Sequence, residues 1–127
     1  FSQMLVNQGA LDGVRILKPE TVKLMRTNVL RDGQTLSSLG AGDGDRYAGL
    51  GMGLTFGTIE EPNAVRSKTP AGSFFWGGAA STWFWIDPVN ELYFIGMVQI
   101  FDNNNPNGSL ELRETSSEAV YEALVGE

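Results

Sequence analysis

Residues 74–88 read Phe74-Phe75-Trp76-Gly77-Gly78-Ala79-Ala80-Ser81-Thr82-Trp83-Phe84-Trp85-Ile86-Asp87-Pro88, and this stretch decides the fold of the chain. Its aromatic side chains favour an extended, buried strand. Gly77 and Gly78 lack a Cβ atom, so another molecule can approach the backbone closely there. A rigid strand edge with exposed main-chain N–H groups is what an acyl-transfer enzyme uses to stabilise an oxyanion. We therefore predict an active-site strand here, with the nucleophile outside it.

Two further strands are predicted from the pattern around this stretch. Residues 82–86 and 92–100 flank the turn signal at 87–91 and should pair as a hairpin. Residues 50–56 alternate bulky side chains with glycine or threonine, which is typical of a strand with one nearly bare face. The hairpin strands are apolar on both faces, whereas an antiparallel sheet usually exposes one face to water. Both faces of the predicted sheet therefore require cover.

Short helices and a small hairpin are predicted before the sheet. Residues 1–5 have helical spacing, and Gly9 suits the end of that helix. The Asp12-Gly13 turn signal lies between short apolar runs and predicts a hairpin over residues 11–17. A second helix is predicted to have Pro19 in its first turn. Its buried face is predicted to comprise Val22, Met25 and Val29.

A longer helix is predicted after the sheet, over residues 110–125. Its apolar face is predicted to comprise Leu112, Ala119, Val120, Ala123 and Leu124. The sequence thus predicts an α+β fold, with an antiparallel sheet that takes three strands from this chain and helices packed on the faces of the sheet. One long helix cannot cover both faces, so we expect an exposed apolar patch larger than the few hundred Å2 that a soluble monomer tolerates.

Composition excludes several kinds of function. The 127 residues carry a formal charge of −6, which argues against binding to nucleic acid. The absence of cysteine and histidine excludes a thiolate nucleophile and an intrachain Ser-His-Asp triad, and no metal or cofactor site is predicted. No apolar run approaches the roughly 20 residues of a membrane span. No signal peptide is predicted, and a start within a helical pattern suggests a cleaved or truncated product.

Three segments of the chain resemble the serine β-lactamase and penicillin-binding-protein superfamily. Trp76-Gly77-Gly78 resembles the third motif of its esterase-like branch, near the class C β-lactamases. Residues 9–22 are similar to the segment before the active-site strands, and residues 49–54 to a glycine-rich strand between that segment and the third motif. The resemblance implies that residues 1–127 are the C-terminal portion of a single β-lactamase/transpeptidase-like domain. In that family a five-stranded antiparallel sheet takes two strands from the N-terminal end of the protein and three from the C-terminal end.

The first two motifs of the superfamily are absent from the chain. No serine has a lysine three residues later, as Ser-x-x-Lys requires, and no tyrosine has an asparagine two residues later, as Tyr-x-Asn requires. The resemblance therefore implies a partner: a missing N-terminal portion of the same enzyme that carries both motifs. The chain alone is not expected to be active, and whether it belongs to an active enzyme stays open at this point.

The resemblance also implies roles for residues of the third motif. The Ala79 N–H would be one arm of an oxyanion hole, and Trp76, Gly77 and Gly78 would bind substrate. Trp76 replaces the usual lysine and cannot hold a carboxylate by a charge-assisted hydrogen bond, which favours a small ester or amide over a β-lactam. Arg66 and Lys68 are alternative cations, although solvated loop charges are the preferred interpretation.

Two functions are therefore expected. The first is the C-terminal part of a serine hydrolase that works through an acyl-enzyme, and the alternative is a non-catalytic binding or assembly module of the same fold. A soluble protein of the bacterial cytoplasm or periplasm is expected.

For two weaker sequence patterns, a structural role is preferred over a functional one. Residues 103–114 superficially fit an EF-hand calcium loop, but only Glu114 supplies a carboxylate, so a turn before the last helix is favoured. A cluster of strand aromatics offers a ligand platform, but the core interpretation is preferred. This cluster comprises Trp83, Phe84, Trp85, Tyr93 and Phe94.

Overall fold

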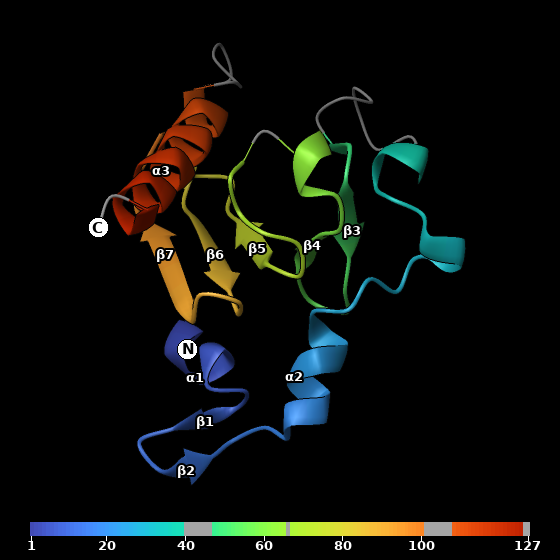
Figure 1. Ribbon diagram of the computed structural model, residues 1–127, viewed down its shortest axis with the longest axis vertical. Helices are drawn as coiled ribbons and strands as arrows, with labels where there is room; N and C mark the ends of the chain where they lie inside the picture. Colours follow the sequence, from blue (N-terminus) through green and yellow to red (C-terminus); the bar gives the residue numbers. More distant parts are fainter. Residues whose placement is uncertain (40–46, 66, 101–107, 126–127) are drawn as a thin grey trace.

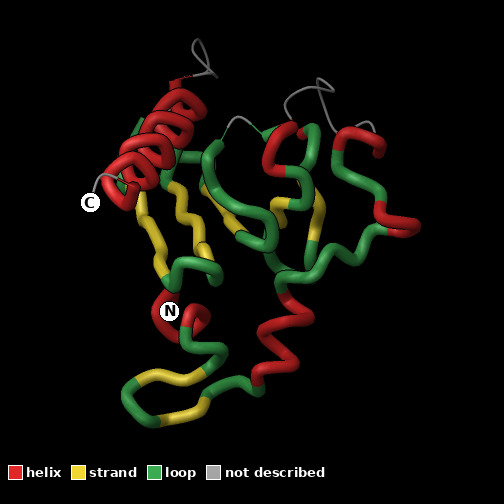
Figure 2. The backbone as a smooth tube through the Cα atoms, in the orientation of Figure 1, coloured by secondary structure: helices red, strands yellow, loops and turns green. Residues whose placement is uncertain are grey.

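The computed structural model describes residues 1–39, 47–65, 67–100 and 108–125 and has an α+β architecture (Figure 1). Its main sheet is antiparallel and contains β3 (Leu50–Met52), β4 (Gly57–Ile59), β5 (Phe74–Gly77), β6 (Trp83–Asp87) and β7 (Leu92–Gly96), in chain order. The helices are α1 (Ser2–Val6), α2 (Pro19–Met25) and α3 (Gly108–Val125). Long loops separate α2 from β3 and β4 from β5 (Figure 2).

The sheet takes five strands from this chain, so the prediction of three strands is wrong. The predicted strand 50–56 forms β3 and the turn that leads into β4, in which the Gly53 N–H donates to the Phe56 carbonyl at 2.8 Å. A Cβ at Gly53 would lie 2.3 Å from the Met25 carbonyl oxygen, so only glycine fits this turn. The aromatic stretch divides into β5 and β6 at a second turn, over residues 78–82. The alternation of bulky and small side chains continues through the first turn, over residues 53–56, so the hydrophobic period does not reveal that turn.

The N-terminal elements largely follow the sequence. The predicted hairpin is confirmed as β1 (Ala10–Leu11) and β2 (Val14–Arg15). Asp12 and Gly13 have φ of 50° and 80° in the turn, as a two-residue hairpin of the primed type requires. The α2 helix begins at Pro19 as predicted, but it ends before Val29, which is 47% exposed rather than buried.

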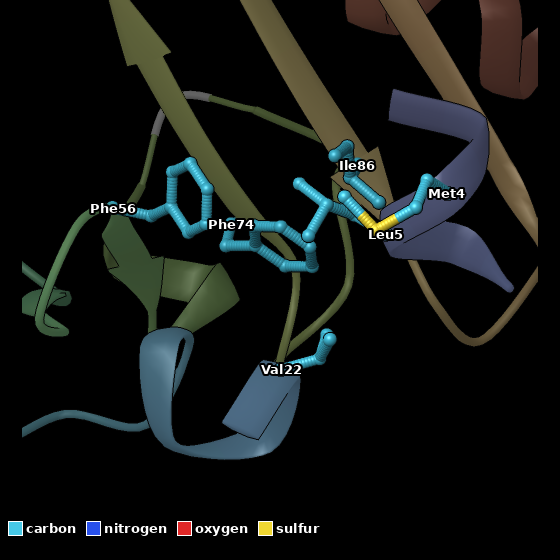
Figure 3. Packing of buried hydrophobic residues seen from close by; sticks show 6 residues of the cluster. All are labelled: Met4, Leu5, Val22, Phe56, Phe74 and Ile86. Atoms are coloured by element: carbon cyan, nitrogen blue, oxygen red, sulfur yellow. The ribbon is translucent and has the colours of Figure 1, made fainter. Parts of the chain in front are cut away.

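Two apolar clusters pack on opposite faces of the sheet. On one face, α1 and α2 cover Phe74 and Ile86 (Figure 3). On the other face, α3 covers Trp83 and Trp85. Neighbouring residues of one strand therefore enter different clusters, as the two-residue period of a strand requires.

The α3 helix faces the sheet with residues that the apolar pattern does not predict. Its buried side chains are Ser117 and Tyr121, whereas Leu112 and Leu124 are 40% and 51% exposed. The Tyr121 ring stacks on Trp85 with a centroid distance of 5.7 Å. Of the predicted apolar face, Val120 packs against this cluster. A search for purely apolar spacing does not identify Ser117 and Tyr121, because both carry polar groups.

A buried carboxylate joins α3 to the β6–β7 hairpin. The Asp87 side chain is fully buried and accepts hydrogen bonds from the Val89 and Asn90 N–H groups, the Asn90 side-chain amide and the Tyr121 hydroxyl. The Tyr121 bond measures 2.6 Å. Burial and the neighbouring Asp87 carboxylate raise the pKa of Tyr121 far above its ordinary value, so the hydroxyl keeps its proton and remains a donor.

Part of the sheet face opposite α3 remains exposed. Trp76, Phe84 and Ile95 lie directly opposite one another on β5, β6 and β7, and we name them the apolar row. Trp76 is 47% exposed and Ile95 is 52% exposed, and Met97 beyond β7 is 82% exposed. The expectation of uncovered apolar surface is confirmed at these residues.

The two outer edges of the sheet differ. The edge of β3 is covered, because the N–H groups of Val29 and Leu36 donate to the Met52 and Leu50 carbonyls at 2.9 and 2.7 Å. Asn28 also accepts a hydrogen bond from the Met52 N–H. Within the part of the chain that the structure describes, nothing forms hydrogen bonds to the outer edge of β7. The sheet therefore has one closed edge and one open edge.

The Tyr121→Phe substitution should test the connection between α3 and the sheet. It removes one donor from a fully buried carboxylate, so the free energy of unfolding should fall by about 1.5–3 kcal/mol. The measurement is urea denaturation at neutral pH. Tyr93→Phe is the matched control, because Tyr93 is 40% exposed and its change should stay within about 0.5 kcal/mol. Equal effects of the two substitutions would contradict this role of Tyr121.

Candidate functional site

The end of β5 places the side chains of the predicted motif on opposite sides of the sheet. Trp76 lies on the same face as Phe74, and its side chain is half-exposed at the end of the apolar row. Gly77 faces the α3 side. The four predicted site residues, Trp76 to Ala79, are consecutive and therefore lie close together at the end of β5.

The bare side of Gly77 is occupied by an arginine of the same chain. A Cβ at Gly77 would lie 2.5 Å from the Arg113 Nη2 atom, so glycine allows the guanidinium of α3 to lie against β5. The close approach that the sequence predicts at this glycine is thus made by Arg113. A Cβ at Gly78 would lie 2.8 Å from the Thr82 Oγ1 atom, so that position is also crowded from within the turn.

Ala79 lies in the turn after β5 rather than in the strand itself. The groups around it are engaged: the Gly78 N–H donates to the Thr82 carbonyl at 2.8 Å, and the Gly78 carbonyl accepts from the Ser81 N–H at 3.0 Å. Among the described residues, none accepts a hydrogen bond from the Ala79 N–H. Ala79 itself is an exposed residue.

The turn is tied to the chain that follows β7. The Ile100 N–H donates to the Ala80 carbonyl at 3.2 Å, and the Ser81 hydroxyl donates to the Ile100 carbonyl at 2.9 Å. These bonds join two segments about 20 residues apart and limit the movement of the turn.

Of the two cations proposed from the sequence, the structure describes only Lys68. Lys68 pairs with Glu122 at 3.3 Å on the exposed surface, and Arg66 lies outside the described residues. Arg113 is the cation that sequence reasoning misses. No local signal marks it, because its proximity to Gly77 arises from the packing of a helix more than 30 residues later.

The aromatic cluster mostly serves the core. Trp83 and Trp85 are 7% and 5% exposed, and Trp85 stacks on Phe94 with a centroid distance of 5.7 Å. Tyr93 differs, since it lies exposed on the opposite face. The preference for a core role is therefore confirmed for the tryptophans.

The described residues form neither a metal site nor a membrane-spanning helix. In the predicted EF-hand-like segment, residues 103–107 lie outside the described residues, and Glu114 belongs to α3. The described ranges contain no group of three or more acidic side chains that could hold a metal ion. None of the helices in those ranges is long and apolar enough to cross a membrane.

The comparisons with known sequences give partial matches. The chain matches no established protein-family profile. It is 39% identical over 103 residues to Protein Rv1367c and to Uncharacterized protein MT1414, both from Mycobacterium tuberculosis. The match covers 78% of this chain and 25% of each relative, so the chain spans about a quarter of the length of these proteins.

A comparison of folds identifies a similar hydrolase. The chain resembles EstCE1, described as a hydrolase with promiscuous acyltransferase activity, with a TM-score of 0.68 and 18% sequence identity. The likeness covers 94% of this chain and 27% of EstCE1. The chain therefore shares the fold of about a quarter of that protein.

A double-mutant cycle should test the contact between Gly77 and Arg113. Gly77→Ala should lower the free energy of unfolding by about 1–3 kcal/mol, because the added methyl group displaces the guanidinium. In an Arg113→Ala background the same change should cost at least about 0.5 kcal/mol less. Additive effects in thermal or urea denaturation would show that the guanidinium is not what restricts Gly77.

Proposed function

We propose that the chain is the C-terminal portion of a β-lactamase-like serine hydrolase domain that works through an acyl-enzyme. Its contribution is the oxyanion-binding turn at the end of β5. The observation that carries this proposal is the Ala79 N–H, which lacks an acceptor among the described residues and follows a strand held between two others. The fold shared with a hydrolase supports it.

The proposed chemistry divides between this chain and the rest of the domain. A serine of the Ser-x-x-Lys motif attacks the substrate carbonyl, while the lysine and a Tyr-x-Asn tyrosine move the proton. The carbonyl oxygen becomes negatively charged in the transition state. It accepts hydrogen bonds from the Ala79 N–H and from the N–H of that serine. This chain supplies the Ala79 side alone, so the isolated chain is inactive.

The proposed substrate is a small ester or amide without a carboxylate beside the reacting carbonyl. Trp76 offers an indole face where a lysine would offer a cation, and it continues into the apolar row formed with Phe84 and Ile95. An apolar surface of this kind suits a hydrocarbon group. The Arg113 guanidinium lies against the other face of β5, across the sheet from the Trp76 side chain.

The proposed partner is the N-terminal portion of the same enzyme. Trp76 and Ile95 of the apolar row are exposed, and among the described residues none forms hydrogen bonds to the outer edge of β7. About three quarters of the length of the relatives and of EstCE1 lies outside the matched region, which is enough chain to cover a sheet face and add strands. Neither nucleic acid nor a membrane is needed to account for these surfaces.

The second candidate function is a non-catalytic binding or assembly module. The exposed apolar row favours it equally, because such a surface can hold a partner without any chemistry. Only the hydrolase function requires a reactive serine elsewhere in the polypeptide.

The Ala79→Pro substitution in the complete polypeptide should test the oxyanion role. Proline removes the N–H group, so kcat for a p-nitrophenyl ester should fall about 100- to 1000-fold. Ala79→Gly is the matched control, because it changes the same residue but keeps the N–H group, and kcat should change far less. Both variants must keep the melting temperature of the parent.

Labelling with a fluorophosphonate probe separates the two candidate functions in the same experiment. The parent polypeptide should be labelled at a serine, whereas the 127-residue chain alone should remain unlabelled. A stable, monodisperse polypeptide that is never labelled would favour the binding module instead.

The Trp76→Lys substitution should test the substrate preference. The parent should hydrolyse a short p-nitrophenyl ester faster than nitrocefin, a β-lactam with a carboxylate. The added ammonium should raise kcat/KM for nitrocefin relative to the ester about 10- to 100-fold, through a charge-assisted hydrogen bond. Trp76→Leu is the control, since it removes the ring without adding charge. Faster nitrocefin turnover by the parent would overturn the preference for esters.

A further inference from the structure

Ser81 has an unusual backbone conformation beside the candidate oxyanion donor. Its φ is 67°, which places a residue with a side chain in the left-handed region that favours glycine. Four other described residues that are not glycine share a positive φ, and Asp12 and Glu91 among them lie in hairpin turns away from the site. A left-handed residue that is not glycine persists only where its surroundings hold it.

Hydrogen bonds from both parts of Ser81 hold it in this conformation. Its N–H donates to the Gly78 carbonyl at 3.0 Å, and its hydroxyl donates to the Ile100 carbonyl at 2.9 Å. The Ile100 N–H returns a bond to the Ala80 carbonyl at 3.2 Å. The turn is thus held by one hydrogen bond within it, to Gly78, and by two hydrogen bonds to Ile100 in the chain after β7.

These bonds hold the peptide group between Gly78 and Ala79 in a defined place. The Gly78 N–H and carbonyl and the Ala80 carbonyl are all occupied, whereas the Ala79 N–H has no acceptor among residues that the structure describes. An oxyanion donor must lie within about 2.7–3.1 Å of the developing charge, so small rotations of this peptide group would weaken it.

We propose that Ser81 is a positioning residue, whose hydroxyl bond to Ile100 and left-handed backbone fix the orientation of the Ala79 N–H. This inference rests on the proposed hydrolase function and names the residue that sets the geometry of the donor. Ser81 acts through the Ala79 peptide group and has no contact with substrate in this role. Its effect should therefore fall on the transition state rather than on ground-state binding.

The test compares Ser81→Gly with Glu91→Gly in the complete polypeptide. Both substitutions place glycine at a positive φ, 67° and 55° respectively, so both relieve backbone strain, but only the first removes a bond beside Ala79. Ser81→Gly should lower kcat for the p-nitrophenyl ester about tenfold with KM unchanged. It should also raise the inhibition constant of an alkyl boronic acid, a tetrahedral transition-state analogue, by a similar factor. Glu91→Gly should leave both values at those of the parent.

Ser81→Asn provides a second variant that keeps the required features. Asparagine tolerates the left-handed region and carries an N–H donor, so kcat should stay within about threefold of the parent. If Ser81→Gly matches the parent in kcat and boronic-acid inhibition, or if Ser81→Asn is as impaired as Ser81→Gly, the positioning role is overturned. A parent polypeptide without ester hydrolysis or fluorophosphonate labelling would overturn the hydrolase function itself, and with it the role of Ser81.

Discussion

The arrangement of helix and sheet depends on one buried carboxylate. Asp87 ends β6, and its oxygens accept four hydrogen bonds, of which three come from the following turn and one from Tyr121 on α3. A charge removed from water is costly unless such donors surround it, so the carboxylate favours a single position of the helix. The polar contact thereby specifies a register that the stacked aromatic rings alone would leave less defined.

The position of α3 determines what lies near the candidate site. On one face of the helix, the Tyr121 hydroxyl donates a hydrogen bond to Asp87. On the same face, Ser117 accepts a hydrogen bond from the Ser67 hydroxyl, which also bonds to the Thr69 hydroxyl. The same placement brings Arg113 against Gly77. The site strand is therefore supported from behind by the last helix, although the residues concerned are distant in sequence. On the opposite side of β5, Phe74 is buried and Trp76 is half-exposed.

The sequence identifies most helices and strands, but it predicts less accurately the residues at which they begin and end. Apolar periodicity identifies β6, β7 and the hairpin at Asp12-Gly13, because these depend on local pattern and turn chemistry. It extends β3 through residues 53–56, because alternation continues there and the contact of Gly53 with the Met25 carbonyl is not visible in a local pattern. It also leaves β5 and β6 as one stretch. The contact between Arg113 and Gly77 and the left-handed Ser81 depend on tertiary packing, which no local pattern encodes. The contiguous residues from Trp76 to Ala79 are the part of the candidate site that sequence reasoning can identify.

The contrast between the two sheet edges limits how this molecule can associate. Asn28 and its neighbours close the β3 side, whereas β7 offers unpaired main-chain groups and an uncharged sequence, within the ranges that the structure describes. A ribbon of many chains needs two open edges on each copy. Within these ranges the sheet can therefore be extended by main-chain hydrogen bonds on the β7 side alone, so edge-to-edge pairing cannot propagate through both sides of the same sheet.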